Sequence, residues 1–582
     1  MYNHITTSMD WQNIQEIVNS LDCLYINVAT VAEDNRIYEE IYTTFEIPLE
    51  NSKGNFKDTK CPNKMLEIYN VEMLSTLLAT EASREGFLFL LFINEITDLW
   101  PVVLNESKNY WSWQRIYKVV YITPTHKRFF HPFVRDVNGN FGSLVDIEEY
   151  NIQKLFHNMN GYPMKVYIFD SVFSSLTADA EGKRLTGVKG TDGKIAHFLE
   201  SYLNYSMQLQ WPDDEFFGSR LDNGSFNGAL GRLMRNETDI VLTGFFVKDY
   251  LANDIAFSSS VYMDQLCCYV MKAKRIPASI LPLHAVDESI WLAYTIVGIL
   301  ASFFWVLLRQ ANLKLNPNEM RNLRGADCRW YTVFIDAWAL WGRMIILRFP
   351  PSNAERMFAI SLCLVSVIIG ALFDSSLATV FIKPLYYKDI TTLEQLNKAN
   401  VRIFYKHPAI KDDLFTGHSS PIYQSLDQRM LLVGEPEERL ISIMAKRGKF
   451  AAVTRAYSLS LVDIYYFITK KVYMIPECPK AYHIAFPMQK HSPFEEEINV
   501  ALLKLLAGGF INHWIEMQQY VARSRIHLFE DYAGESEHIW KILNINDLQL
   551  AFYVLSVGLI ASFFLYICEH IYYKCKLRRR RT

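Results

Sequence analysis

Three long apolar runs constrain this chain more than any other feature of its sequence. Ile290–Leu308 and Leu550–Cys568 carry no charged side chain, and Met357–Phe381 carries only Asp374. A helix needs about 20 apolar residues to cross the roughly 30 Å hydrocarbon core of a bilayer. Each run therefore predicts a transmembrane span, and the lipid bilayer is the first partner that the sequence implies.

A fourth apolar segment, Trp330–Ile346, is short and contains Asp336, Trp338 and Arg343. Irregular backbone at membrane depth is tolerated only where protein or a water-filled cavity surrounds it. We interpret the segment as a re-entrant pore segment; an ordinary short span and an interfacial helix are the alternatives. The two charges are either pore-facing or form an internal Asp336–Arg343 pair, two turns apart on one helix face.

The basic residues predict the orientation of the spans, because Lys and Arg in short loops favour the cytoplasm. They gather in two places: the loop after the first run, and the tail 569–582 with its arginine run. The first and third spans would then run from outside to inside and the second would return. We therefore expect a multi-pass plasma-membrane protein with an extracellular N-terminus and a cytoplasmic C-terminus. The loop residues are Arg309, Lys314, Arg321, Arg324 and Arg329.

The glycosylation sequons agree with this orientation. All four precede the first span, where N-x-S/T predicts N-linked glycans on an extracellular surface. Met1–Asn27 lacks the charged start and apolar run of a signal peptide. Either the first span alone directs translocation of the residues before it, or this N-terminus is truncated; we favour truncation. The sequon asparagines are Asn105, Asn204, Asn223 and Asn236.

The polar parts of the chain have the pattern of an α/β protein. Gly86–Ile93 is typical of a buried parallel strand, and Gly190–Leu203 has apolar residues at helical spacing. The segment Thr391–Asn400 is typical of a helix. Further strands are expected at Met164–Phe169, Asp239–Thr243, Val401–Tyr405 and Phe450–Thr454.

Composition and motifs exclude several function classes. The net charge of −3 argues against a nucleic-acid partner held by bulk charge. The sequence has no H-E-x-x-H, G-x-S-x-G or P-loop motif, so we expect no catalytic residues, no metal, no cofactor and no enzyme activity. Cys23 and Cys61 are either a disulfide or two buried thiols. The adjacent Cys267 and Cys268 fit neither a C-x-x-C metal site nor a simple bridge.

The order of these segments resembles the ionotropic glutamate receptor family. GVKGTDGKIAHFLESYLNYS (187–206) is similar to its first-lobe helix, and GALGRLMRNETDIVLTGFFVKDYLANDIAFSSSVY (228–262) to its G-x-x-G-x-L…F-S segment. ITTLEQLNKANVRIFY (390–405) resembles the start of its second lobe. FDSSLATVF (373–381) stands where the family has its gate motif.

The resemblance implies a multi-pass α-helical membrane protein with three spans and one re-entrant pore loop. It also implies an extracellular α/β bilobal ligand-binding domain like that of periplasmic binding proteins. The gate would contain Asp374, Ser375, Ser376, Ala378 and Thr379. The implied organisation is an N-terminal α/β domain at 1–160, ligand-binding lobe 1 at 161–285, spans at 290–308, 357–381 and 550–568, the pore segment at 330–346, lobe 2 at 383–547, and the basic tail at 569–582.

Departures from the family pattern argue against glutamate as the ligand. Leu251 stands where the family has the arginine that binds the α-carboxylate, and the nearest basic residue is Lys248. Arg455 falls near the acid that should meet the α-ammonium group; it either serves an acidic or polar ligand or makes a surface salt bridge. Cys478 is the only cysteine between Lys383 and Asp547, so the family's second-lobe disulfide is expected to be missing.

These departures resemble the divergent chemosensory ionotropic receptors of insects. The sequence therefore predicts a subunit of a ligand-gated cation channel that senses a small-molecule ligand and assembles with co-receptor subunits as a heteromeric tetramer. One alternative is a non-conducting regulatory subunit of such a receptor. Another is a membrane-anchored bilobal solute-binding protein or enzyme, although the sequence offers it no catalytic constellation.

Overall fold

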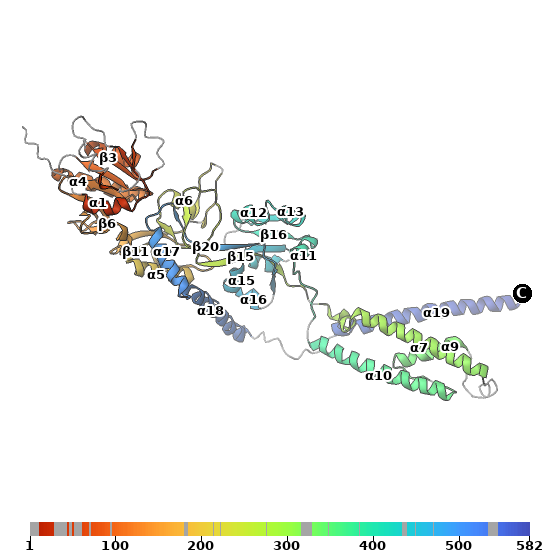
Figure 1. Cartoon of the computed structure of the whole chain (residues 1–582). Helices are drawn as coiled ribbons and strands as arrows, with labels where there is room; N and C mark the ends of the chain where they lie inside the picture. Colours follow the sequence, from red (N-terminus) through yellow and green to blue (C-terminus); the bar gives the residue numbers. More distant parts are fainter. Residues whose placement is uncertain are drawn as a thin grey trace, which may run out of the picture. The chain divides into compact units, whose positions relative to one another are not determined.

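The computed structural model contains two units, one α/β and one helical (Figure 1). The first comprises Met1–Met271 and Thr391–Leu528, and the second Lys272–Ile390 and Phe529–Thr582. The structure describes residues 11–27, 43–45, 49–51, 61–68, 71–92, 96–179, 184–213, 215–221, 223–274, 276–315, 329–346, 349–382, 385–433, 439–447, 450–468, 471–533 and 545–581. The loop residues Arg321 and Arg324, used to predict orientation, lie outside these ranges.

The N-terminal sheet has the strand order β2-β1-β3-β4-β5-β6-β7. Strands β1 to β5 are parallel, and β6 and β7 add an antiparallel edge. Strand β4 (Leu88–Phe92) is buried on both faces, which confirms the strand predicted at Gly86–Ile93. The other strands are β1 (Leu24–Asn27), β2 (Leu49–Asn51), β3 (Lys64–Ile68), β5 (Val119–Ile122), β6 (Lys127–Arg135) and β7 (Phe141–Asp146).

Alternation along β4 explains how the helices cover this sheet. Leu88, Leu90 and Phe92 pack in one cluster with α3 (Leu74–Glu81) and α4 (Trp100–Gln114). Phe89 and Leu91 point the other way, into a cluster that contains α1 (Gln12–Asn19).

The five-stranded sheet follows, in the order β11-β8-β12-β21-β14. Helix α5 (Gly190–Leu203) confirms the helix expected in this segment; α17 (Glu495–Ala507) packs beside it, and α6 (Gly228–Met234) covers the other face (Figure 1). The strand predicted at Met164–Phe169 begins two residues earlier. The strands are β8 (Tyr162–Tyr167), β11 (Tyr205–Gln210), β12 (Ile240–Val241), β14 (Ile255–Phe257) and β21 (Pro487–Gln489).

The third large sheet is organised around β15 (Tyr262–Met271) and is called the β15 sheet below. Its order is β13-β20-β15-β18-β16-β17, and β19 also pairs with β15. Helices α14 (Leu440–Arg447) and α15 (Ala456–Leu461) pack on it. Its other strands are β13 (Phe245–Phe246), β16 (Arg402–Tyr405), β17 (Met430–Leu432), β18 (Phe450–Arg455), β19 (Val472–Met474) and β20 (Lys480–Ala485).

These two sheets do not divide where the sequence suggested. Strand β15 precedes the first apolar run, yet it pairs with β18 and β20 from beyond the second run. Conversely, β21 joins the five-stranded sheet by pairing with β12 and β14. Continuous lobes at 161–285 and 383–547 are therefore wrong in detail, because long-range antiparallel pairing exchanges strands between the two halves.

Among the described residues of the second unit, three helices are long and apolar enough to cross a membrane: α7 (Glu288–Leu315), α10 (Asn353–Ile382) and α19 (Gln549–Arg581). Helix α9 (Trp330–Trp341) has 12 residues, a length of about 18 Å at 1.5 Å per residue. The bent pair α17 and α18 (Phe510–Ala533) also passes the apolarity test as a fourth candidate. Its residues Ile498, Leu502 and Ile511 are buried in the first unit's core.

The remaining elements are short. The helices are α11 (Leu393–Lys398), α12 (Pro408–Leu414), α13 (Pro421–Asp427) and α16 (Ile464–Ile468), and the small hairpin is β9 (Ser175–Ala178) with β10 (Leu185–Lys189). Short 3-10 helices occupy Val71–Met73, Thr97–Leu99, Ile152–His157, Ala278–His284 and Ile545–Leu548. Strands β16 and β18 and helix α11 confirm the elements predicted for 391–405 and 450–454.

Candidate functional site

A cleft of about 790 Å³ separates residues of the five-stranded sheet from residues of the β15 sheet. One wall is formed by the loop after β8 and the turn Glu215–Ser219. Gly244, Phe246, Lys248 and Tyr250 also line the cleft, from the segment that contains strand β13 of the β15 sheet. The other wall is formed where β16, β17 and β18 end and the helices that follow them begin. Small-molecule sites in proteins typically occupy clefts of this size.

The cleft lining combines aromatic and charged side chains. Phe246 lies 4.7 Å from Tyr482, and Phe217 lies 5.2 Å from His407 across the cleft, measured between ring centroids. Charged side chains of both signs also line it, so the cleft offers apolar surface and polar anchor points together. These charged residues are Lys248, Lys406, Arg439 and Arg455 with Asp170, Glu215 and Asp463.

Arg455 lines the cleft from the end of β18. Its Nε donates to Asp264 Oδ2 at 2.6 Å, and its Nη2 donates to the Tyr262 hydroxyl at 3.4 Å. The guanidinium also lies 5.3 Å from the centroid of the Phe246 ring. Its side chain is 11% exposed and that of Asp264 is fully buried. Arg455 is therefore both cleft-lining and part of a buried ion pair, and the expected surface salt bridge is wrong.

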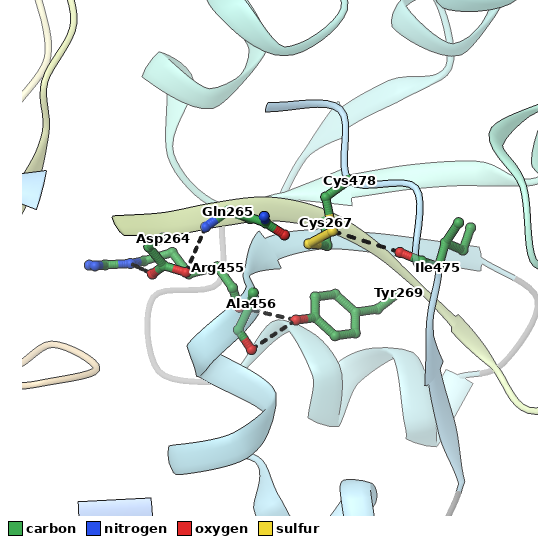
Figure 2. Close-up of a disulfide and its surroundings, with 8 residues drawn as sticks. All are labelled: Asp264, Gln265, Cys267, Tyr269, Arg455, Ala456, Ile475 and Cys478. Carbon is green, nitrogen blue, oxygen red and sulfur yellow. Dashed lines mark hydrogen bonds and ion pairs between the residues drawn. A yellow bond between two sulfur atoms is a disulfide. The ribbon is translucent and has the colours of Figure 1, made fainter. Parts of the chain in front are cut away.

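A disulfide close to this ion pair corrects the expectation for the cysteines. Cys267 on β15 is bonded to Cys478 (Figure 2). The sequence had suggested that Cys267 fits no simple bridge and that the second-lobe disulfide is missing. Both expectations are wrong, because β15 enters this sheet from before the first span and brings Cys267 to Cys478 from outside residues 383–547. Cys23 and Cys61 also form a disulfide.

Burial shifts the pKa values of three groups in or behind the cleft. It raises the pKa of Asp463 to about 6, against the opposing charge of Arg439, and lowers the pKa of His407 to about 4. Burial also raises the pKa of Asp192 to about 7, although Gly244 N–H donates to its Oδ2 at 3.2 Å. The Asp192 Oδ1 has no hydrogen-bond partner among the described residues.

The other two predicted ligand-binding positions have different surroundings. Lys248 lines the cleft, with its ammonium group 5.3 Å from the centroid of the Tyr250 ring. Leu251 is 65% exposed and has a left-handed backbone with φ of 59°, and it is not among the described residues that line the cleft. The four sequon asparagines are exposed.

The predicted pore and gate residues lie in the second unit. Arg343 follows the end of α9, and its Nη1 donates to Asp374 Oδ2 on α10 at 3.0 Å. The alternative of an Asp336–Arg343 pair on one helix face is wrong, because α9 ends at Trp341 and Arg343 has a left-handed φ of 59°. Trp338 packs against Gly298 of α7. The gate residues Ser375, Ser376, Ala378 and Thr379 all lie on α10.

Arg343 packs closely against α10. Its Nη2 donates to the Val367 carbonyl at 3.0 Å and its Nε to the Ser366 carbonyl at 3.4 Å. A Cβ added to Gly370 would stand 1.8 Å from the guanidinium carbon. The glycine therefore makes room for the arginine.

A buried carboxylate in the same unit was not singled out from the sequence. Glu355 near the start of α10 is fully buried and accepts hydrogen bonds from three groups of α7. Arg309 Nη2 lies 2.7 Å away, and the side chains of Trp305 and Asn312 donate at 3.3 and 3.2 Å. The one sequence signal was its charge next to an apolar run. This network joins α7 to α10.

Comparison with known proteins finds similarity to ionotropic glutamate receptors of the delta-2 type. It is 21% identical over 457 residues to glutamate receptor ionotropic, delta-2, from Homo sapiens, a match that covers 74% of this chain and 43% of that protein. The Mus musculus protein matches equally, and the Danio rerio protein is 21% identical over 453 residues. The match thus spans less than half the length of these relatives. No family model matches the chain. The chain is a distant relative of the ionotropic glutamate receptor family.

Proposed function

We propose that the chain is a subunit of a chemosensory ligand-gated cation channel, whose cleft takes a small organic ligand other than glutamate. The single observation that carries this proposal is the cleft between the five-stranded sheet and the β15 sheet. The strands exchanged between these sheets make a two-lobed clamshell, so a ligand that touches both walls would favour closure. In this reading the two lobes are the bilobal ligand-binding domain that the family resemblance implies.

The proposed topology has support from strand pairing. Strands β15 and β18 flank the segment that contains α7, α9 and α10 and share one sheet, so both must lie on the same side of a membrane. An even number of crossings must therefore separate them, and α7 and α10 supply two. A crossing by α9 would make the number odd, and its length of about 18 Å is short of the roughly 30 Å core. Helix α9 is thus best explained as a re-entrant segment.

This topology has a direct test. An epitope placed after Thr582 should stay hidden from antibody in intact cells and become accessible on permeabilisation. An epitope in the exposed turn Val137–Asn140 should be labelled in intact cells. Labelling of the C-terminal epitope without permeabilisation would reject the proposed orientation.

The cleft chemistry supports a ligand that is not an α-amino acid. Arg455 stands near the place where the family resemblance leads us to expect an acid, and Asp264 already pairs with it. Asp463 is a weak candidate for holding an ammonium group, because burial disfavours its charged form and the neighbouring cations Arg439 and Lys406 already act on it. The aromatic rings and the cations Lys248 and Lys406 favour a ligand with an apolar body and a polar or acidic group.

The experiment is current recording from cells that express the chain with candidate co-receptor subunits, during a screen of small chemical classes. We expect a ligand-evoked cation current that needs this chain. The proposal would be contradicted if the chain reaches the cell surface with every partner and the ligand-evoked currents are the same with and without it.

One observation favours the alternative of a non-conducting regulatory subunit. Arg343 places a cation beside the proposed pore segment, and positive charge lining a pore disfavours cations. The ion pair with Asp374 reduces that effect, so we keep conduction as the first proposal. The test uses Ala378→Trp and Asp374→Asn. If both variants leave the ion selectivity of the current and its inhibition by pore blockers unchanged, the chain does not line the pore. The regulatory role would then be the better proposal.

A further inference from the structure

We propose that the N-terminal domain and the five-stranded sheet form one rigid body, joined by a buried contact surface that we call the junction. The junction contains Arg115, Trp111 and Phe133 from the N-terminal domain and Asp239 and Tyr162 from the five-stranded sheet region. Domains of one chain move relative to one another by default unless their interface is large and apolar. The junction is a continuous apolar contact with a buried ion pair inside it.

A buried bidentate ion pair lies in the junction. Arg115 Nε donates to Asp239 Oδ1 at 2.7 Å, and Nη2 donates to Oδ2 at 3.1 Å. The two residues are 9% and 7% exposed. Arg115 Nη1 also donates to the Trp111 carbonyl, and Asp239 Oδ2 accepts the Lys165 N–H. Paired and further hydrogen-bonded charges of this kind impose a defined geometry, and removing one partner would leave the other buried and unpaired.

Aromatic packing surrounds the ion pair. Trp111 Nε1 donates to the Tyr162 hydroxyl at 2.9 Å, and their ring centroids are 6.0 Å apart. Phe133 lies 5.3 Å from Tyr162 and 5.1 Å from Phe156. All four side chains are at least nine-tenths buried. They belong to one continuous cluster that reaches from the N-terminal sheet to the five-stranded sheet, so no solvent layer separates the two parts there.

The junction also includes residues that follow the second apolar run in the sequence. Phe494, just before α17, lies 6.1 Å from Trp111 and 5.5 Å from Phe156. Glu497 accepts from His157 Nδ1 at 2.8 Å. Glu85 of the N-terminal domain lies 2.8 Å from His491 Nε2. Both halves of the sequence that build the five-stranded sheet are therefore held against the N-terminal domain.

The junction lies at the opposite end of β12 from the cleft. Asp239 directly precedes β12, and Gly244, soon after its end, lines the cleft. This consequence rests on the proposed function: if a ligand closes the cleft, the moving part is the β15 sheet, and the N-terminal domain stays fixed to the other wall. A partner that binds the N-terminal domain would then act on the cleft through a rigid connection.

A cleavable linker tests the rigid body in the full-length protein. Residues Glu148–Asn151 between the two parts are exposed, and neither disulfide among the described residues crosses them. A protease site inserted after Glu149 would cut the chain in detergent after purification. The N-terminal fragment should remain bound to the C-terminally tagged remainder, because the junction holds it without a covalent link.

Variants distinguish the ion pair from general adhesion. We expect Arg115→Ala and Asp239→Asn each to release the fragment at a urea concentration at which most wild-type fragment is still bound. Arg128→Ala removes the Arg128–Asp146 pair within the N-terminal domain and serves as the matched control, with release as in wild type. Two results would overturn the proposal. In one, the wild-type N-terminal fragment separates from the tagged remainder as soon as the chain is cut, without urea. In the other, all three variants release the fragment equally. The readout needs neither ligand nor current, so it is independent of the proposed channel activity.

Discussion

The guanidinium of Arg455 and the carboxylate of Asp264 lie 2.6 Å apart at the back of the cleft, on adjacent strands β18 and β15. One strand lies after the second apolar run and the other before the first. The pair therefore fastens together the two halves of the chain that the membrane segments separate. It also occupies the side chain that the sequence had offered as a ligand contact.

Breaking this ion pair should destabilise the first unit. Arg455→Met leaves the fully buried Asp264 without its cation, and removing one partner of a buried pair costs about 3–5 kcal/mol. The midpoint of urea unfolding of the purified chain should fall accordingly. Lys398→Met is the control, because its pair with Glu394 is exposed and solvent screens such pairs, so its loss should hardly change the midpoint. Equal midpoints for the two variants would argue against a buried pair.

The disulfide Cys267–Cys478 should stabilise the β15 sheet. Removing a native disulfide typically costs about 2–5 kcal/mol, so Cys478→Ser should lower the melting temperature. The Cys23→Ser/Cys61→Ser double variant isolates this bond from the other disulfide. In that background a reducing agent should lower the melting temperature, and the further change Cys478→Ser should abolish the response to reductant. A response that persists without Cys478 would show that the bond is not formed.

Asp192 should make stability depend on pH. Its pKa is about 7 in the folded chain against an ordinary value of 3.8, so between these values the folded state holds a proton that the unfolded state has released. The free energy of unfolding contributed by this group therefore falls as pH rises from about 4 to about 7 and then stays level. Asp192→Asn should remove this part of the slope.

The measurement for Asp192 is the difference in melting temperature between wild type and Asp192→Asn at pH 5 and at pH 8. The difference cancels contributions that both proteins share, such as that of Asp463, whose pKa of about 6 falls in the same window. The exposed Asp170→Asn is the control. The same difference at both pH values would mean that Asp192 does not titrate there.

The Arg343–Asp374 pair should matter to the proposed pore. Asp374→Asn removes the carboxylate that receives Arg343 Nη1 and should lower cation conductance without abolishing surface delivery. Arg343→Asp and Asp374→Arg should each impair assembly, because each leaves two like charges side by side. The charge swap that combines them should impair assembly less than either single change. A bulky residue at Ala378 or Thr379 should disturb helix approach and leave a standing current. Indistinguishable conduction by Asp374→Asn and wild type would place Asp374 away from the ion path.

Local patterns in the sequence predicted the elements that depend on neighbouring residues. The three apolar runs predicted α7, α10 and α19, and the helical spacing of Ile195, Leu199 and Leu203 predicted the helix α5. These features can be recognised from neighbouring residues alone, without knowing which distant residues they contact. The predicted family relationship is confirmed as a distant one. It could be predicted because it depends on the order of such locally recognisable segments.

Contacts between distant residues were not predictable in the same way. Cys267 and Cys478 are 211 positions apart, and Arg115 and Asp239 are 124 apart. Nothing near either partner in the sequence identifies the other. Strand exchange brings the two cysteines together, and packing of the N-terminal domain against the five-stranded sheet brings Arg115 to Asp239. The Arg343–Asp374 pair was missed because the end of α9 at Trp341 changes the direction of the chain just before Arg343.

The most direct test of the central claim is the ligand response of the assembled receptor. Cells that express the chain with a partner subunit that gives current should respond to a small non-amino-acid ligand and not to glutamate or glycine. Lys248→Met, which changes the cleft wall, should shift the concentration for half-maximal current while surface delivery stays unchanged. A robust glutamate-evoked current that Lys248→Met abolishes would contradict the account.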